Sequence, residues 1–482
     1  PIVGKKIEKK VEEVRAKKIS KGYIDKLALQ SAFSEKKIKI AAIMDEFTSV
    51  CFDPEADVCH ITPENWQSEI LKFAPDVLFI ESAWKGKDSL WQGKVSHQSI
   101  ELINLIKFCD ENNIRSIFWS KEDPVHFGTF LGVAELVDTV FTTDIDCIQK
   151  YKEHLGHDRV YLLCFAAQPT IHNPIEVYER QDKFNFAGSY YLKYPIRQRD
   201  FGVLSKVAQG YKGLDIFDRN FDKPHPHYQF PENYQPMIIG TLQPSEIDKA
   251  YKGYVYGINI NTIKQSQTMF ARRVFEMLAS NTIVISNYSR GVRLLFGDLV
   301  ICSDEATEVS RQLEKFTEDF LTQKKYKLQG LRKVLSHHTY QHRLKYVLEK
   351  SFETNLNSHK ASILVIAHAQ NQYELESIVK SFNAQSYSEK ELLILSDLEL
   401  GDVTEKNITI YNTKSELVEA VEKYQEDAYI AVFNVKDSYG HYYLYDLVQS
   451  LTYLDYSDKD PIVAVTKDSY FENVNDKAEL IQ

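Results

Sequence analysis

The chain has 482 residues, of which 43% are hydrophobic and 26% are charged, and its formal net charge is −10. This length predicts two to four domains, and this composition predicts globular domains and excludes a disordered chain. The negative charge argues against a nucleic-acid groove, and the sequence contains no run of about 18 apolar residues that would predict a membrane span.

The opening segment, residues 1–36, is expected to be helical. Residues 5–18 are rich in Lys and Glu and carry apolar residues at helical spacing (Ile7, Val11 and Val14). We expect a solvated helix, and contact with an anionic membrane surface is the alternative. The segment lacks the apolar core of a secretory signal, and its start at Pro1 indicates a piece of a longer protein.

The cysteines are widely spaced and include no C-x-x-C pair, so they predict neither a zinc site nor a disulfide scaffold. The six are Cys51, Cys59, Cys109, Cys147, Cys164 and Cys302. We therefore expect buried thiols in a reducing cytosol. The predicted location is cytoplasmic, with the inner face of the cell membrane as a further option.

A first domain is predicted over residues 37–175. Short apolar runs alternate there with helical segments such as residues 99–113, which is typical of a parallel sheet with helices on both faces. The runs are residues 37–46, 76–82, 116–123, 139–146 and 161–168. Several end in polar side chains, and the carboxyl ends of parallel strands are where open sheets bind ligands.

A second domain of the same class is predicted over residues 176–345. Its apolar runs are residues 184–191, 213–220, 237–242, 256–262, 282–287 and 298–304. Two such domains in tandem favour a small-molecule site between them. A third, smaller α/β domain is predicted over residues 360–482.

Residues 260–286 carry the richest pattern of the second domain. Phe270, Val274, Met277 and Leu278 form one apolar helix face, and Ser266 is a candidate N-cap. A strand, a polar turn and a helix can present N–H groups to a phosphate. The nearby cations are Lys264, Arg272 and Arg273, and Glu276 can accept hydrogen bonds from a ribose.

The alternative is a surface helix with an Arg272–Glu276 ion pair worth a few tenths of a kcal/mol. Residues 260–286 contain no glycine-rich phosphate loop, so they do not predict a Walker or G-x-G-x-x-G site. Gly188, at the end of an apolar run, allows a ligand to approach the backbone closely, although a plain turn also explains it.

Motifs in both domains resemble those of the CgeB-like glycosyltransferases and, more widely, of the two-Rossmann GT-B class. They are ESAWKGKDSLW (81–91), FWSKEDPVHF (118–127), VFTTD (140–144), FAAQPTIHNP (165–174), FAGSYY (186–191), LDIFDRN (214–220) and FARRVFEMLASNTIVISNYSRGVRLLF (270–296). The resemblance implies sugar transfer from a nucleotide diphosphate without a bound metal or cofactor. It implies that Glu276 holds the donor ribose and that Lys264, Arg272, Arg273 and Gly188 surround the diphosphate.

Ser266 and Thr268 complete the expected donor site. Many retaining members carry a glutamate where this chain has Thr268, so the resemblance leaves the stereochemistry open. The third domain resembles the opening of a GT-A glycosyltransferase, with Asn371 and Asp397 at nucleotide-contacting positions. Only Asp437 remains of its metal motif, and Lys436 beside it opposes a cation, so we expect an inactive accessory domain.

The candidate catalytic residues are Glu122, Asp123 and His126 at the edge of the first domain. An inverting transfer needs a base there, and the neighbouring Lys121 is expected to lower the carboxylate pKa values. An ordinary solvated turn is the alternative. Trp84 is a candidate for stacking on a sugar ring, and core packing explains it equally well.

The sequence thus predicts a glycosyltransferase that uses a nucleotide sugar, with UDP as the expected nucleotide. The expected acceptor is a bacterial cell-surface glycopolymer such as teichoic acid. Two alternatives stay open: a sugar-nucleotide epimerase, and a non-catalytic scaffold of an envelope-polymer assembly. A homo-oligomer is a further expectation that the sequence leaves undecided.

Overall fold

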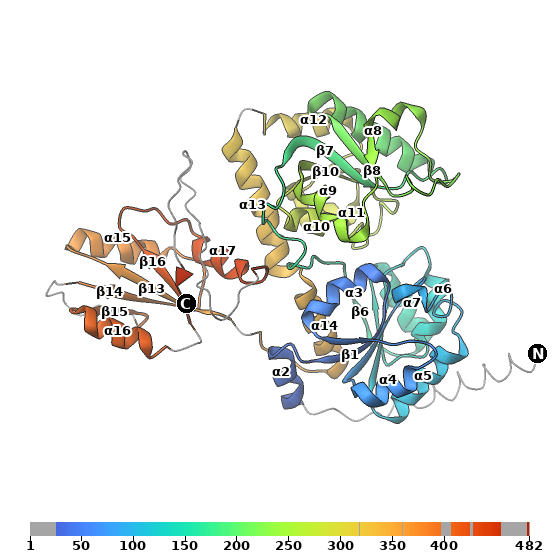
Figure 1. Ribbon diagram of the computed structural model, residues 1–482, viewed down its shortest axis with the longest axis horizontal. Helices are drawn as coiled ribbons and strands as arrows, with labels where there is room; N and C mark the ends of the chain where they lie inside the picture. The colour runs from blue at the N-terminus through green and yellow to red at the C-terminus, as the bar shows by residue number, and fades with distance from the viewer. Residues whose placement is uncertain are drawn as a thin grey trace, which may run out of the picture. The chain divides into compact units, whose positions relative to one another are not determined.

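The computed structural model forms two compact units, Pro1–Asn357 and Ser358–Gln482 (Figure 1). It describes residues 26–317, 319–358, 360–396, 406–424, 428–454 and 480–481. The helix expected over residues 5–18 lies outside this range, and the described part of the opening segment contains α2 (Lys26–Ser34). Within the described residues, no helix combines the length and apolarity that a membrane span requires.

The first domain of the larger unit is a six-stranded parallel sheet in the order β2-β1-β3-β4-β5-β6. Alternate residues of each central strand enter different cores: Ile40 and Ala42 pack on one face, Ala41 and Ile43 on the other. Burial on both faces explains the continuous apolar runs. The elements are β1 (Lys39–Ile43), α3 (Glu46–Phe52), β2 (Asp57–His60), α4 (Trp66–Phe73), β3 (Val77–Glu81), α5 (Ile100–Glu111), β4 (Arg115–Ser120), α6 (Phe127–Ala134), β5 (Thr139–Thr142), α7 (Ile145–Leu155) and β6 (Val160–Leu162).

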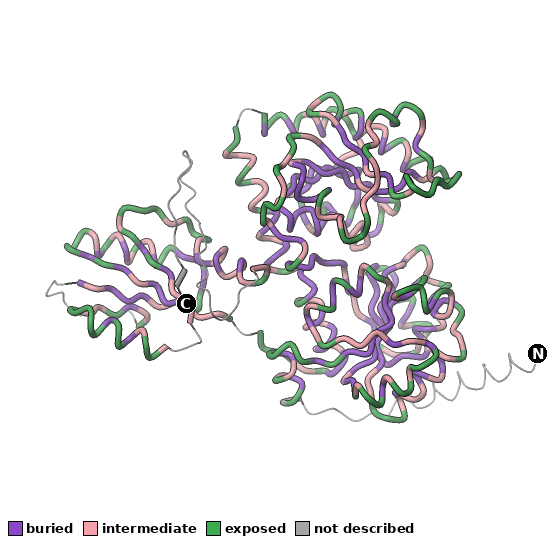
Figure 2. Tube along the Cα trace, in the orientation of Figure 1, coloured by how far each residue is buried: buried purple, intermediate pink, exposed green. Residues whose placement is uncertain are grey.

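The second domain repeats this design, with parallel strands in the order β12-β11-β10-β7-β8-β9. Figure 2 shows its buried strands surrounded by exposed helices and loops. The elements are β7 (Gln181–Gly188), α8 (Pro195–Tyr211), β8 (Leu214–Asp218), β9 (Ile238–Gly240), α9 (Asp248–Lys252), β10 (Tyr254–Asn259), α10 (Arg273–Ala279), β11 (Ile283–Ser286), α11 (Arg290–Phe296), β12 (Ile301–Cys302), α12 (Ala306–Glu314) and α13 (Phe320–His337). The predicted fold class of two Rossmann-like domains is confirmed.

The chain returns to the first domain after α13. Helix α14 (Tyr340–Phe352) packs against α3, and the Arg343 guanidinium donates to the carbonyls of Cys164 (2.8 Å) and Phe165 (2.9 Å). The predicted domain limit at residue 345 therefore falls inside α14. One apolar core runs from the first sheet through α10 to α14, so the two domains share buried surface.

The smaller unit is an α/β domain with the strand order β15-β14-β13-β16-β17. Four strands are parallel, and β17 pairs with β16 in the antiparallel sense. Its elements are β13 (Ser362–His368), α15 (Gln372–Asn383), β14 (Lys390–Leu395), β15 (Ile408–Tyr411), α16 (Lys414–Glu422), β16 (Ala428–Phe433), α17 (Tyr443–Ser450) and β17 (Leu480–Ile481). The α/β class is confirmed, and the GT-A resemblance stays a prediction.

The two nucleotide contacts expected in this domain have different outcomes. The Asn371 side chain accepts the N–H of Glu374 (3.0 Å) and caps α15, so it has a structural role. Asp397 lies outside the described residues. Beside Asp437, the Tyr439 ring stacks on Phe433 with 3.9 Å between centroids.

Candidate functional site

Gly188 ends β7 at the carboxyl edge of the second sheet, and the half-buried Arg273 lies against it. A Cβ atom placed on Gly188 would come within 3.4 Å of Nη1 of Arg273, whose guanidinium lies 5.5 Å from the Phe186 ring. This Nη1 atom is buried and has no hydrogen-bond partner among the described residues. Gly188 thus places no side chain next to an unsatisfied cationic donor.

Two more arginines border the same place. Arg219 follows β8, and its N–H donates to the carbonyl of Gly188 (3.2 Å). Burial, together with the charges of Arg273 and Arg219, lowers the pKa of Arg197 to about 10. Burial and Arg219 also lower the pKa of Arg273, against the opposing influence of Tyr251 and Glu276. Positive charge therefore accumulates at this edge, as an anion-binding site requires.

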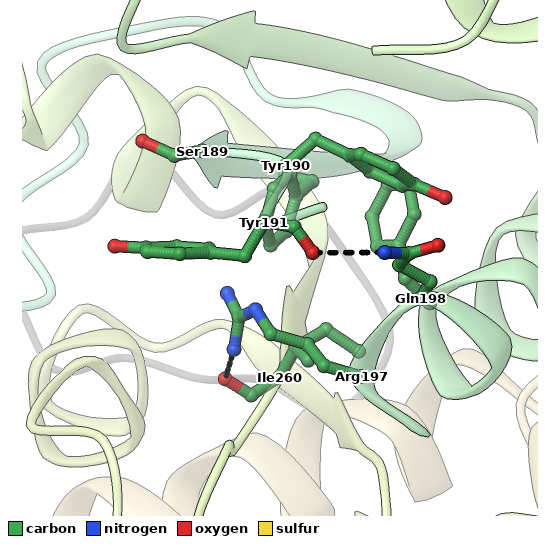
Figure 3. A pocket seen from close by; sticks show the side chains of 8 residues that line it. Ser189, Tyr190, Tyr191, Arg197, Gln198 and Ile260 are labelled. Atoms are coloured by element: carbon green, nitrogen blue, oxygen red, sulfur yellow. Dashed lines mark hydrogen bonds between the residues drawn. The ribbon is translucent and has the colours of Figure 1, made fainter. Parts of the chain in front are cut away.

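We define Arg197, Arg219 and Arg273 as the arginine cluster. Arg197 also lines a pocket at the end of β7 (Figure 3). Arg197 donates from Nη1 to the carbonyl of Ile260 (2.6 Å) and lies 4.9 Å from the Tyr191 ring. Gln198 donates to the carbonyl of Tyr191 (3.1 Å). The pocket is lined by Phe186, Ser189, Tyr190, Tyr191, Arg197, Gln198, Phe201 and Ile260. The pocket therefore has aromatic walls and one guanidinium, that of Arg197, whose acceptor is the uncharged carbonyl of Ile260.

Lys264, a predicted diphosphate ligand, is held by carboxylates. Its Nζ lies 2.7 Å from Oδ2 of Asp200 and 2.5 Å from Oδ2 of Asp304. Asp200 is fully enclosed and also accepts a hydrogen bond from Asn287 (2.9 Å). The charge of Lys264 is therefore neutralised in this conformation, and binding a diphosphate would require breaking these ion pairs.

The helix expected to start at Ser266 begins at Arg273 and has only seven residues, so the predicted N-cap is wrong. The Ser266 hydroxyl instead accepts the N–H of Met269 (2.9 Å). Thr268 Oγ1 reaches the first domain, where it donates to the carbonyl of Thr143 (2.9 Å) and accepts the N–H of Ile145 (2.9 Å). Because Ser266 and Thr268 form these hydrogen bonds, residues 266–272 stay outside the helix and connect the second domain to the first.

Glu276, the predicted ribose ligand, has both carboxylate oxygens engaged. Arg272 Nη1 lies 3.0 Å from Oε1, and the Tyr251 hydroxyl donates to Oε2 (2.9 Å). His172 lies 4.0 Å from the same carboxylate, and burial lowers its pKa to about 4. Glu276 is only 2% exposed, so the alternative of a surface ion pair is wrong. Burial opposes its ionisation, but Arg272 and the hydrogen bond from Tyr251 help to keep its pKa below the ordinary value.

An ionic triad closes the carboxyl edge of the first sheet. Nζ of Lys121 lies 2.7 Å from Oδ2 of Asp45 and 2.8 Å from Oε1 of Glu81. Phe47 lies above it, with its ring 4.0 Å from Lys121 Nζ and 4.0 Å from the Arg272 guanidinium of the second domain. The polar ends of these strands predicted an edge rich in functional groups, but their pairing was not predicted. Lys121 lies 76 positions after Asp45 in the sequence, and no local sequence pattern predicts a pairing over that separation.

The three candidate catalytic residues separate in the structure. Asp123 is fully buried and accepts a hydrogen bond from the Thr142 hydroxyl (2.6 Å). Burial raises its pKa to about 6, which corrects the expectation that Lys121 lowers it. Glu122 and His126 are half-buried, and His126 packs edge to face on Trp84 with 4.9 Å between centroids. Asp123 therefore belongs to the core, whereas Glu122 and His126 remain accessible.

No group of three or more His, Cys, Asp or Glu side chains is placed to hold a metal ion within the part of the chain that the structure describes. All six cysteines are free thiols.

Comparison with known proteins supports the class of the second domain. Residues 205–349 match the family model described as glycosyl transferase-like, a span that contains Arg219, Arg273 and Glu276. This region is a glycosyltransferase domain, and the prediction of a glycosyltransferase is confirmed at this level. The CgeB-like subfamily stays a prediction. A sequence search of curated proteins finds no significant match.

Solved structures that are similar to this chain, at low sequence identity, include glycosyltransferases. One from Rickettsia africae ESF-5 is 11% identical, with a TM-score of 0.44 over 66% of this chain and 98% of that one. The phage T4 enzyme BGT, solved with its substrate UDP-glucose, is 12% identical, with a TM-score of 0.41 over 66% and 99%. A variant of S. aureus TarM, solved with fondaparinux, α-GlcNAc-glycerol and UDP, is 9% identical, with a TM-score of 0.37 over 59% and 57%.

Proposed function

We propose that the protein transfers a sugar from a nucleoside diphosphate sugar, held at the arginine cluster, to an acceptor at the edge of the first domain. The buried Nη1 of Arg273 supports this proposal above all. A buried guanidinium donor without a partner is costly, and phosphate oxygens are strong acceptors for it. Gly188 places no side chain next to this donor.

The arginine cluster can also assist the chemistry. When the bond between sugar and diphosphate breaks, negative charge grows on the leaving diphosphate. Guanidinium groups held in advance by Ile260 and the Phe186 ring stabilise that charge without reorganising. These residues would lower the barrier, whereas Lys264 would stay paired with Asp200 and Asp304 and act as a structural cation.

The acceptor side of the proposal rests on accessible groups of the first domain. Trp84 is 37% exposed and is braced by His126 and Phe130, as a platform for a sugar ring would be. His126 or Glu122 would take the acceptor proton if the transfer inverts the configuration. Asp123 is not proposed for this role, because its carboxyl group is enclosed in the core.

The finer assignment follows the motif resemblance. We propose a UDP-sugar as donor and a bacterial cell-surface glycopolymer such as teichoic acid as acceptor. Under this proposal Glu276 approaches the ribose only if it exchanges a bond to Tyr251 or Arg272 for one to the ligand.

The test is nucleotide binding by calorimetry with UDP, GDP and dTDP and their glucose derivatives. Arg273→Gln should weaken the binding of the preferred nucleotide by tenfold or more, because a charged hydrogen bond contributes about 1.5–3 kcal/mol. Arg311→Gln is the matched control, since Arg311 is exposed on α12 and pairs with Glu308. Equal affinities of the Arg273 variant and the wild type would remove the basis of the proposal.

Product analysis separates the two alternatives. A glycosyltransferase without acceptor should release free sugar slowly from its preferred donor, whereas an epimerase would yield a second nucleotide sugar that NMR distinguishes. A scaffold without catalytic function would show neither turnover nor a thermal shift with any of these nucleotides.

A further inference from the structure

Two neighbouring loops of the second domain expose large apolar side chains. Residues 189–196 follow β7 and include the first two residues of α8, and residues 219–228 follow β8. The exposed fractions are 45% for Leu192, 61% for Ile196 and 53% for Phe221. Water-exposed side chains of this size gain free energy if they enter an apolar medium.

The two loops lie side by side and hold each other in place. The N–H of Leu192 donates to the carbonyl of His227 (3.0 Å), and Asn220 Nδ2 donates to Ser189 Oγ (3.1 Å). The rings of Tyr191 and Tyr228 are 5.1 Å apart. The exposed apolar residues therefore belong to one surface, which we call the loop pair (residues 189–196 and 219–228).

The charge of the loop pair is opposite to that of the protein. Lys193, Arg219 and Lys223 are exposed there, and Asp222 is its one acidic residue. His225 and His227 are also exposed. The whole chain has a formal net charge of −10. A positive surface on a negatively charged protein indicates that its partner is anionic.

We propose that the loop pair docks on an anionic lipid surface. Leu192, Ile196 and Phe221 would enter the interfacial layer while Lys193 and Lys223 contact the headgroups, the combination of forces that holds peripheral proteins on membranes. An anionic soluble polymer would be bound by the lysines alone and would not need the apolar side chains. Because Arg219 belongs both to the loop pair and to the arginine cluster, docking places the proposed donor site at the membrane surface.

The test is co-sedimentation of the full chain with vesicles. The probes are vesicles of phosphatidylcholine alone and vesicles with about 30% phosphatidylglycerol. We expect binding to the anionic vesicles that weakens with added salt. The substitution set Leu192→Ser, Ile196→Ser and Phe221→Ser should reduce it at least tenfold, and so should Lys193→Glu with Lys223→Glu.

The matched control is Leu71→Ser with Leu294→Ser, because these leucines are 65% and 64% exposed but lie on α4 and α11. This control should bind vesicles like the wild type. Equal binding to both kinds of vesicle would overturn the proposal, as would full binding by the loop variants, which would assign binding to another part of the chain. Binding to soluble polyphosphate that depends on the lysines but not on the apolar residues, without vesicle binding, would identify a polymer site instead. None of these readouts depends on sugar transfer.

Discussion

Replacing Lys121 by Met should destabilise the first domain, because it leaves two carboxylates without their counter-charge. Glu81 is fully buried, and Asp45 is 14% exposed at its side chain. Burial raises the pKa of Glu81, whereas Lys121 and the N–H groups of Lys85 and Gly86 hold the pKa of Asp45 below its ordinary value despite its burial. Lys121 thus supplies the positive charge that stabilises the carboxylates of Glu81 and Asp45 inside the domain.

The expected cost is about 3–5 kcal/mol at neutral pH, the range found when one partner of a buried ion pair is removed. Since stability falls by about 1–3 kcal/mol per molar urea, the unfolding midpoint should decrease by at least about 1 M. Tryptophan fluorescence measures this transition selectively, because all four tryptophans lie in the first domain (Trp66, Trp84, Trp91 and Trp119).

The control is Lys94→Met, which removes an ion pair with Glu101 whose side chains are 31% and 34% exposed. Such partly exposed pairs contribute at most about 1 kcal/mol, so its midpoint should stay close to that of the wild type. Adding Glu81→Gln to Lys121→Met should recover part of the loss, because one uncompensated charge disappears. If Lys121→Met unfolds with the midpoint of the control, Lys121 is not the counter-charge on which the first domain depends.

Three further outcomes follow from the site. Gly188→Ala should crowd the Phe186 ring, which the added Cβ would approach to 3.0 Å, disturb the Arg273 guanidinium beside that ring, and weaken nucleotide binding about tenfold in calorimetry, with little change in the unfolding curve. Asp123 has a pKa of about 6 in the folded protein against an ordinary 3.8, so folding favours its protonated form and stability should fall as the pH rises from about 4 to 6. Asp123→Asn should remove that slope from fluorescence-detected unfolding. Thr268→Val should speed hydrogen exchange at the amide of Ile145 several-fold, because that amide loses its acceptor.

The strands were largely predictable because burial on both faces leaves uninterrupted apolar runs in the sequence. Every predicted run of the two large domains overlaps a strand. Strand β2 was missed because its four residues are half-exposed at the sheet edge. Strand β15, which was also missed, is equally short. Such strands form through pairing with a neighbour, and their own sequence contains little of that information.

The candidate site was predictable only in its residue types. Gly188 and Arg273 were selected from local pattern, and they are neighbours in the structure. Arg219 was overlooked because its proximity to Gly188 depends on the pairing of β7 with β8. Lys264 had the expected charge, but long-range partners neutralise it. Charge can thus be read from a sequence, whereas its compensation by distant groups cannot.

The return of the chain in α14 restricts how the two large domains can move. Ala167 lies in the segment that follows β6. Its N–H donates to the carbonyl of His338 (2.9 Å), and its carbonyl accepts the N–H of Tyr340 (3.0 Å), so hydrogen bonds join the two interdomain crossings. Because the two crossings are joined at one place, they permit the two domains to open and close by rotation but resist sliding and separation of the domains. A shortened chain that ends before residue 340 would lose this connection, and its first domain would expose the apolar surface that α14 covers.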